Sequence, residues 1–239
     1  MPHKHIFMVA EVYKPEKAEY IWCHILIFLS KRHNSAGQIS AIAERKQLCP
    51  SDEYGLYLAV AGIKPVTLQD RFAGEELRVL KRLGMKTDDT YTMYPHLMVT
   101  FVGRSHADVS LAAYARNDYE LGHALGYPSD AVLKYSELTS QGKPPALAYL
   151  YNMITAVENG VQLPSWLAYI DHVPSEYNLR KGRVAQSSEE HARIAMEYTV
   201  KNNYQLACKL HIDFFNKVSG IMKEAGDLKQ LMHFHYQTE

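Results

Sequence analysis

The chain has 239 residues, a length that suits one large domain or two small ones. Hydrophobic residues make up 47% and charged residues 22% of it, which excludes disordered, collagen-like and disulfide-scaffold proteins. The 26 basic residues balance the 26 acidic ones, so the sequence lacks the overall positive field that attracts nucleic acid or an anionic membrane. The composition therefore predicts an ordinary soluble protein.

Cysteine usage and the apolar runs predict a cytoplasmic protein. Cys23, Cys49 and Cys208 form an odd set without a C-x-x-C pair, which favours a reducing compartment over a disulfide framework. The longest apolar run, at 21–29, contains His24 and is far shorter than the roughly 20 residues that cross a bilayer. The first residues lack the apolar region of a signal peptide, so we expect neither export nor a membrane span.

The first 102 residues are predicted to mix strands with helices. Residues 6–12 are almost continuously apolar, and residues 97–102 are rich in β-branched and aromatic side chains, as in buried strands. Residues 16–33 begin with acidic and end with basic side chains, which suits the dipole of a helix. Further elements are predicted as helices at 38–48, 53–61 and 70–83 and as a short strand at 66–68.

The rest of the chain has a helical pattern, interrupted by glycine, proline and asparagine breakers. Residues 161–183 form a long irregular segment, and Ser187 opens the next helix with a capping-box-like start. Apolar side chains then repeat at helical spacing over 204–222. Before the irregular segment, short helices are predicted at 108–115, 119–125, 129–138 and 145–158.

These patterns predict an α+β fold that is predominantly helical, with a small N-terminal β-sheet. We expect the sheet to contain the strands at 6–12 and 97–102, and the helical C-terminal half to pack on the stripe at 204–222. A single compact domain over 1–239 is the favoured organisation. The alternative is an N-terminal α+β lobe at 1–104 and a helical lobe at 105–239.

The most suggestive local motif is LGHALGYP at 121–128. It predicts a helix that ends at Gly126, a turn through Tyr127 and Pro128, and a second helix that starts at Ser129. Free backbone amides at a helix start attract an anion, and Tyr127 could donate its hydroxyl there. A structural turn, with glycine as the C-cap and proline at the next helix start, is the favoured interpretation of the motif alone.

A second candidate lies in the irregular segment, where Asp171 directly precedes His172. Histidine exchanges protons near neutral pH and a carboxylate can fix its tautomer, so the pair is a candidate for general acid–base chemistry. Adjacent side chains often point apart, however. The alternative is a histidine that only contributes hydrogen bonds to packing.

The sequence predicts no metal site and identifies no cofactor. The pairs His3 with His5 and His233 with His235 could each offer two ligands, but both lie near chain ends and lack a third ligand. The signatures of P-loop, dinucleotide-binding, hydrolase and zinc-protease sites are absent from the sequence.

The chain resembles a family of archaeal proteins of unknown function over roughly residues 97–200. That family runs from a strand ending in Ile/Val-Gly-Arg into L-G-x-x-L-G-Y-P-x-C-C, then H-x-P-C-S and a C-E-E-S helix start. The pieces that match here are Val102-Gly103-Arg104, LGHALGYP at 121–128, His172-Val173-Pro174 and Ser188-Glu189-Glu190.

Every cysteine of the family pattern is replaced in this chain. Asp130 and Ala131 stand at the paired cysteines, Ser175 follows His-x-Pro, and Ser188 stands at the last cysteine position. Serine is a poor substitute for a thiolate ligand, so any metal or thiol chemistry of the family is not expected here. The resemblance implies no activity that could be carried over.

We expect an intracellular enzyme or binding protein for a small polar or anionic molecule. Its site would lie where the turn at 126–128 faces the loop at 171–174, with His172 as general acid or base and Asp171 beside it. Whether the protein is an enzyme stays open. The predicted ligand-binding residues are Arg104 and the helix start at Ser129 and Asp130, which would hold an anion, and Tyr127, which would orient the ligand.

Two other functions stay open at this point. The same motifs would also tie helices together in a non-catalytic interaction or scaffold protein, and a homo-oligomer is compatible with either class. The basic tract of Arg180, Lys181 and Arg183 leaves RNA binding as a further alternative. A cavity that contains both His172 and Tyr127 would favour ligand binding over a scaffold.

Overall fold

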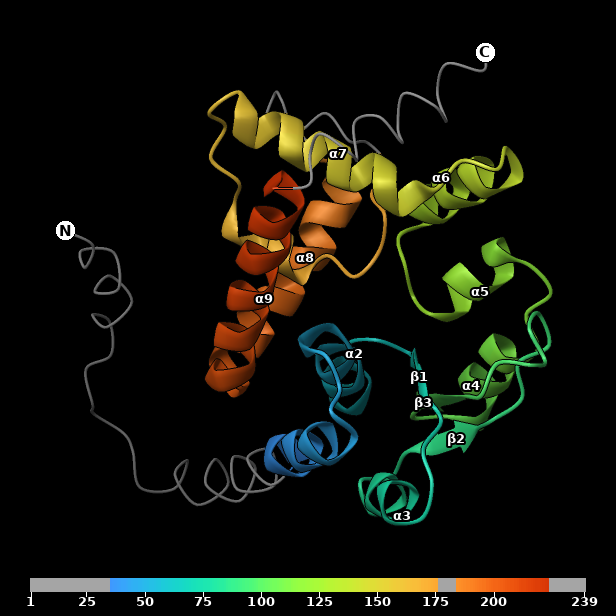
Figure 1. The fold of residues 1–239 in the computed structure, drawn as a ribbon. Coiled ribbons are helices and arrows are strands. Elements are labelled where there is room, and N and C mark those ends of the chain that lie inside the picture. The colour runs from blue at the N-terminus through green and yellow to red at the C-terminus, as the bar shows by residue number, and fades with distance from the viewer. Residues whose placement is uncertain (1–34, 176–183, 224–239) are drawn as a thin grey trace, which may run out of the picture. The chain divides into compact units, whose positions relative to one another are not determined.

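The computed structural model describes residues 35–175 and 184–223. Helices dominate this part of the chain and a small antiparallel sheet accompanies them, which confirms the predicted α+β, mostly helical fold (Figure 1). The strand predicted at 6–12, the helix at 16–33 and the basic tract at 180–183 lie outside the described residues. In chain order the elements are a helical segment at 35–46, α2 (Pro50–Ala61), β1 (Val66–Asp70), α3 (Glu75–Arg82), β2 (Lys86–Asp88), β3 (Val99–Gly103), α4 (His106–Ala113), α5 (Asp118–Ala124), α6 (Ser129–Ser140), α7 (Pro145–Glu158), the 3₁₀ helix η1 (Ser165–Tyr169), α8 (Gln186–Asn202) and α9 (Tyr204–Lys223).

The sheet has the strand order β1-β3-β2, and both pairings are antiparallel. Val66 pairs with Gly103 in one ladder and Lys86 pairs with Gly103 in the other. The strands predicted at 66–68 and 97–102 therefore exist as β1 and β3 and lie side by side. The sequence analysis missed β2, because its three residues, Lys-Thr-Asp, carry no apolar pattern.

The central strand β3 is buried on both of its faces. Successive strand residues point to opposite sides of a sheet. Phe101 belongs to a buried cluster with residues of α4 and α5, whereas Val102 belongs to a second cluster with residues of α2 and α9. Double-sided burial explains why apolar residues of β3 do not alternate with exposed polar ones; its one polar side chain, Thr100, is itself buried.

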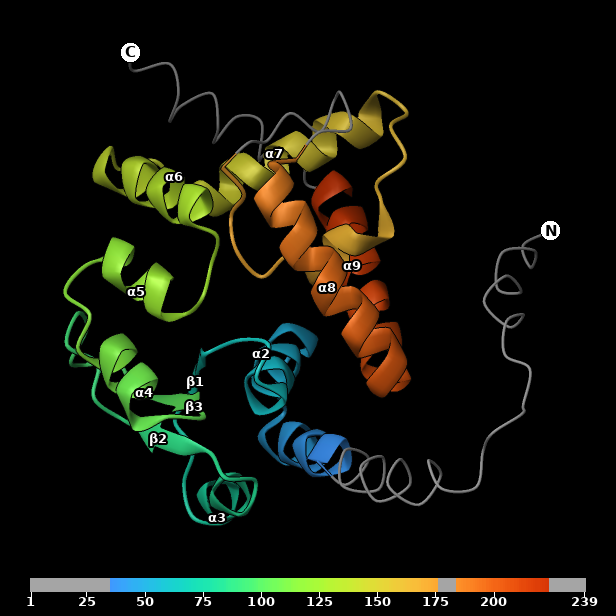
Figure 2. The ribbon, with the colours of Figure 1, turned by 180° about the vertical axis from the view of Figure 1, so that it is seen from behind.

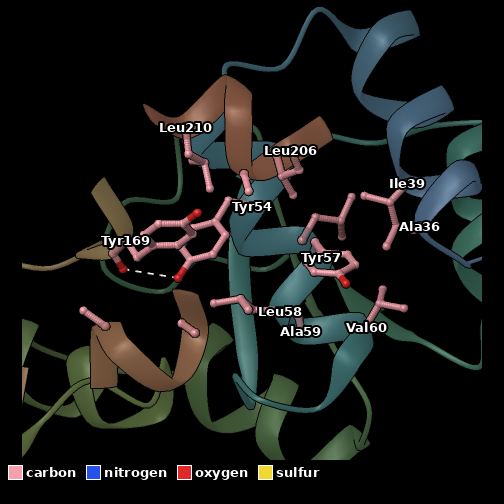
Figure 3. Packing of buried hydrophobic residues seen from close by; sticks show 14 of the residues in the cluster. Ala36, Ile39, Tyr54, Tyr57, Leu58, Ala59, Val60, Tyr169, Leu206 and Leu210 are labelled. Carbon is pink, nitrogen blue, oxygen red and sulfur yellow. Dashed lines mark hydrogen bonds between the residues drawn. The ribbon is translucent and has the colours of Figure 1, made fainter. Parts of the chain in front are cut away.

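The larger cluster joins segments that are far apart in the sequence (Figure 3). Tyr54 of α2 donates its hydroxyl to the carbonyl of Tyr169 at 3.2 Å, and the two rings meet edge to face at 5.8 Å. Glu53 is buried beside them and accepts from Ser40 and from Lys209 of α9. A buried charge needs such partners, so these bonds fix α2 between the helix at 35–46 and α9.

Helix α9 contacts both α7 and α8, as the opposite view also shows (Figure 2). It buries Leu206, Ala207, Leu210 and Val218. The helix was predicted, but Phe215 of the predicted stripe is exposed, so the buried face is only partly the predicted one.

The predicted start of the helix at 70–83 was wrong. Residue 70 ends β1, paired with Val99, and the helix α3 begins only at Glu75. Gly74 precedes it with a φ of 53°, a conformation that interrupts a right-handed helix. Within the described ranges no helix has the length and hydropathy to span a membrane. The prediction of one domain over the whole chain stays a prediction, because residues 1–34 are not described.

Candidate functional site

The turn between α5 and α6 places Tyr127 against the segment that follows α2. Gly126 has a φ of 82°, and the Tyr127 amide donates to the Gly122 carbonyl at 3.1 Å, a glycine C-cap as the motif predicts. A Cβ at Gly126 would lie only 2.5 Å from Cδ of Pro65. The glycine is therefore needed both for its backbone conformation and for this close approach to Pro65, the neighbour of Lys64.

Lys64 is the centre of the buried polar network. Its side chain is 4% exposed, and its ammonium donates to Oδ2 of Asp171 at 2.6 Å and to the Tyr127 hydroxyl at 3.1 Å. The ammonium also lies 4.4 Å from the centre of the Tyr127 ring. One cation thus joins the turn at 127 to the loop at 171.

Burial and pairing act in opposite directions on this ion pair. Burial alone would lower the pKa of Lys64, but Asp171 and Tyr127 more than reverse this and raise it above its ordinary value. Burial alone would raise the pKa of Asp171, but Lys64 and His172 hold it well below its ordinary range. Both groups are therefore charged at neutral pH, and each neutralises the other.

His172 has a partner at each ring nitrogen. Nδ1 lies 3.3 Å from Oδ1 of Asp171, and Nε2 lies 2.9 Å from Oγ of Ser188. The His172 side chain is 3% exposed, and its ring lies 5.3 Å from the Tyr127 ring, centre to centre. The structure thus brings the predicted residues Tyr127, Asp171 and His172 together.

The order carboxylate, imidazole, hydroxyl is that of a Ser-His-Asp triad, but the serine cannot serve as its nucleophile. Ser188 is 0% exposed, and it is not among the residues that line the cavity described below. Both ring nitrogens of His172 already have hydrogen-bond partners, so a ligand in the cavity would meet the face of its ring. These contacts support a positioning role for Asp171 and His172.

His191 of α8 completes the only candidate metal cluster among the described residues. The ligand atoms of Asp171, His172 and His191 lie within 4.8 Å of one another. Burial lowers the pKa of His191, which keeps the imidazole neutral and able to bind a metal. The Lys64 ammonium, however, already neutralises Asp171, and a divalent ion would place three positive charges around one carboxylate. The donor set therefore fits a metal ion only if Lys64 leaves.

A cavity of about 620 Å³ opens beside this network. Such a volume is typical of small-molecule sites. Aliphatic and tyrosine side chains form most of its wall, and no lysine or arginine is among the described lining residues. The residues that line it are Leu68, Tyr91, Tyr94, Asp118, Leu121, Gly122, Leu125, Tyr127, Ala131, Val132, Tyr135, Tyr149, Ile170, Asp171, His172 and Val173.

The predicted anion-binding residues lie elsewhere. Arg104 does not line the cavity; its guanidinium donates to the carbonyl of Val60 at 2.6 Å and so satisfies the C-terminus of α2. Ser129 is exposed, and it is not among the described lining residues. The described residues therefore give an anion in this cavity no cationic partner among its lining side chains.

Asp130 is a structural link at the start of α6. Its carboxylate accepts from Ser175 and Ser187, each at 2.6 Å, and so ties α6 to the loop and to α8. Burial alone would raise the pKa of Asp130, but the two serines and the backbone amides of residues 130 and 131 lower it below its ordinary value. This carboxylate already occupies the helix start that was expected to hold an anionic ligand.

The sequence analysis missed Lys64, Ser188, His191 and Asp118. No local signal could have identified Lys64, since its partner Asp171 is 107 residues away in the chain. A partial signal existed for Ser188, because it stands at a cysteine position of the archaeal pattern. Two other such positions, Asp130 and Ser175, share a hydrogen bond.

Comparisons of the chain with protein-family models, with curated proteins and with solved structures found no match. The resemblance to the archaeal family therefore stays a prediction.

Proposed function

We propose that the protein binds a small organic molecule in the cavity between the turn at 126–128 and the loop at 170–173. The observation that carries the proposal is that Tyr127 and His172, from two distant parts of the chain, line one cavity of ligand size. A scaffold that used these motifs only to tie helices together would bury both against apolar neighbours and leave no such space.

Tyr127 would hold the polar group of the ligand. Its oxygen accepts from Lys64, and no described residue accepts the proton of its own hydroxyl. Burial raises the pKa of Tyr127, and Lys64 only partly offsets this, so the hydroxyl stays protonated at neutral pH. It can therefore donate to a carbonyl, hydroxyl or ether oxygen of a ligand.

The apolar part of the ligand would lie against the aliphatic wall. Leu121, Leu125 and Val132 come from the two helices of the turn, and Leu68 comes from β1. Burial of apolar surface there would supply most of the affinity, and the single hydrogen bond would orient the molecule. Binding is the function that this arrangement supports; a reaction at His172 would first require one of its two hydrogen bonds to break.

Titration with tryptophol, a neutral indole that carries a hydroxyl, tests the proposal. We expect saturable binding by calorimetry, lost in Val173→Trp, where the new ring fills the cavity. Val200→Trp, which changes an exposed position of α8 outside the cavity wall, is the control and should bind normally. Tyr127→Phe should weaken binding roughly 2- to 10-fold through the lost hydrogen bond. Equal affinity in Val173→Trp, or no saturable binding to the wild-type protein, would contradict the proposal.

A further inference from the structure

The two carboxylates in the cavity wall differ in their charge balance. Asp171 is neutralised by Lys64 at 2.6 Å. Asp118, the first residue of α5, forms no ion pair with any described lysine, arginine or histidine. Among the described residues the cavity therefore contains one negative charge without an ion-pair partner, and such a charge favours a ligand that brings a positive one.

Three tyrosines line the same cavity as this charge. They are Tyr91, Tyr94 and Tyr135, and the rings of Tyr91 and Tyr94 meet edge to face at 5.4 Å. Burial raises the pKa of Tyr91 and of Tyr135, and the negative charge of Asp118 raises both further. Faces of aromatic rings beside a carboxylate are the usual surroundings of an organic ammonium group.

Two of the tyrosines that line the cavity with Asp118 are more exposed than the residues of the Lys64 network. Tyr94 is 43% and Tyr135 is 38% exposed, whereas the side chains of Asp171 and His172 are 11% and 3% exposed. A cation beside the exposed rings would keep part of its hydration, which limits the cost of binding it.

We propose that the cavity selects organic cations, with the ammonium group of a protonated or methylated amine held between Asp118 and the rings of Tyr94 and Tyr135. The apolar body of the ligand then lies against the aliphatic wall, and an oxygen acceptor, where the ligand has one, meets Tyr127. This inference rests on the proposed function and adds the charge class of the ligand.

Three indoles that share a scaffold and differ in charge provide the test: tryptamine is a cation, tryptophol is neutral and indole-3-acetate is an anion at pH 7. We expect tryptamine to bind roughly tenfold more tightly than tryptophol, and indole-3-acetate to bind most weakly. Asp118→Asn should remove the preference for tryptamine and leave the affinity for tryptophol unchanged. Glu120→Gln is the matched control, because it removes a charge from the same helix at a partly exposed position outside the cavity wall, paired with Arg116.

The ring contribution is tested at Tyr94. Replacing Tyr94 with leucine should weaken tryptamine several-fold more than tryptophol, whereas Tyr119→Leu, an exposed tyrosine of α5 outside the cavity wall, should change neither. Equal affinity for tryptamine and tryptophol, or tightest binding of indole-3-acetate, would overturn the charge inference while leaving the proposed cavity function intact. Failure of all three indoles to bind would overturn both.

Discussion

At the scale of single residues, the network depends on Lys64. Its ammonium is the only described cation within ion-pairing distance of Asp171 that is charged at all physiological pH values, and both groups are largely buried. Removing one member of a buried pair leaves the other without compensation, which costs far more than removing both.

Lys64→Met should lower the free energy of unfolding by about 3–5 kcal/mol, because it leaves the Asp171 carboxylate buried and unpaired. The double variant with Asp171→Asn should be more stable than the single one. Lys134→Met, which breaks an exposed pair with Glu137, should change stability by less than about 1 kcal/mol. Urea denaturation followed by circular dichroism measures all three; similar losses at Lys64 and Lys134 would show that the buried pair is unimportant.

The same pair predicts how stability depends on pH. The pKa of Asp171 is lowered in the folded protein, so its contribution is present above the ordinary aspartate pKa of about 4 and is lost as the pH falls below it. The pKa of Lys64 is raised, so its contribution is present below about pH 10.5 and is lost as the pH rises further.

We therefore expect the free energy of unfolding to be nearly constant across neutral pH and to fall in acid. Asp130, whose pKa is also lowered, contributes in the same direction. In the double variant Lys64→Met with Asp171→Asn, the acid decline should be shallower than in the wild type. Urea titrations at a series of pH values from neutral to acid measure this, and parallel declines in both proteins would refute it.

Three residues of the buried polar network around Lys64 could be predicted from the sequence. Tyr127, Asp171 and His172 stand in local motifs whose chemistry is visible in the sequence. Lys64 and Ser188 are ordinary residues in their local contexts, and only the fold brings them to the site.

At the scale of elements, the turn between α5 and α6 carries the most specific sequence requirement. Gly126 needs a left-handed backbone and also lies against Pro65. Gly142, which follows α6, has a similar φ of 69°, but a Cβ at that position would have no other atom within 4 Å. Both glycines therefore have a left-handed backbone, but only Gly126 also lies against a neighbouring residue.

Gly126→Ala should lower the free energy of unfolding by about 2–4 kcal/mol, from the left-handed backbone and from overlap with Pro65. Gly142→Ala, with backbone strain alone, should cost about 1 kcal/mol. Because the turn positions Tyr127, Gly126→Ala should also weaken tryptophol binding, which Gly142→Ala should not. Equal losses of stability in the two variants would exclude the steric contribution of Pro65.

Element prediction succeeded where breakers and hydrophobic periodicity coincide. The helix predicted at 145–158 has those bounds in the structure, because prolines precede it and Asn159 with Gly160 end it. The pattern failed at β2, which is three residues long and lies at the sheet edge. The helix start predicted at residue 70 was also wrong. Pairing with β3 extends β1 to Asp70, and α3 begins only at Glu75.

At the scale of the whole molecule, the balance of charge controls association. Twenty-six basic residues equal 26 acidic ones, and the isoelectric point is about 7.2. A protein without net charge lacks the mutual repulsion that keeps molecules apart.

We expect solubility in polyethylene glycol solutions to be lowest near pH 7, the isoelectric point, and to increase toward about pH 6 and about pH 9, where the protein carries net charge. Measuring the precipitation point across this range tests the expectation. A minimum below pH 6 would show that the exposed charges are far from balanced.

The fold class could be predicted for the whole molecule, but the neighbours of each strand could not. The strands at 6–12 and 97–102 were expected in one sheet; residues 6–12 lie outside the described residues, and the described neighbours of β3 are β1 and β2. Strand pairing is a contact between distant segments, and the apolar pattern of a strand does not identify its neighbour.

The separation between Lys64 and Asp171 has a consequence for biosynthesis. The two residues are 107 positions apart, and a ribosome adds about 5–20 residues each second, so the lysine leaves the exit tunnel roughly 5–20 s before its partner does. During that interval its ammonium stays hydrated, because burial of the lysine without its carboxylate partner would cost free energy. Closure of this region must therefore await the synthesis of Asp171.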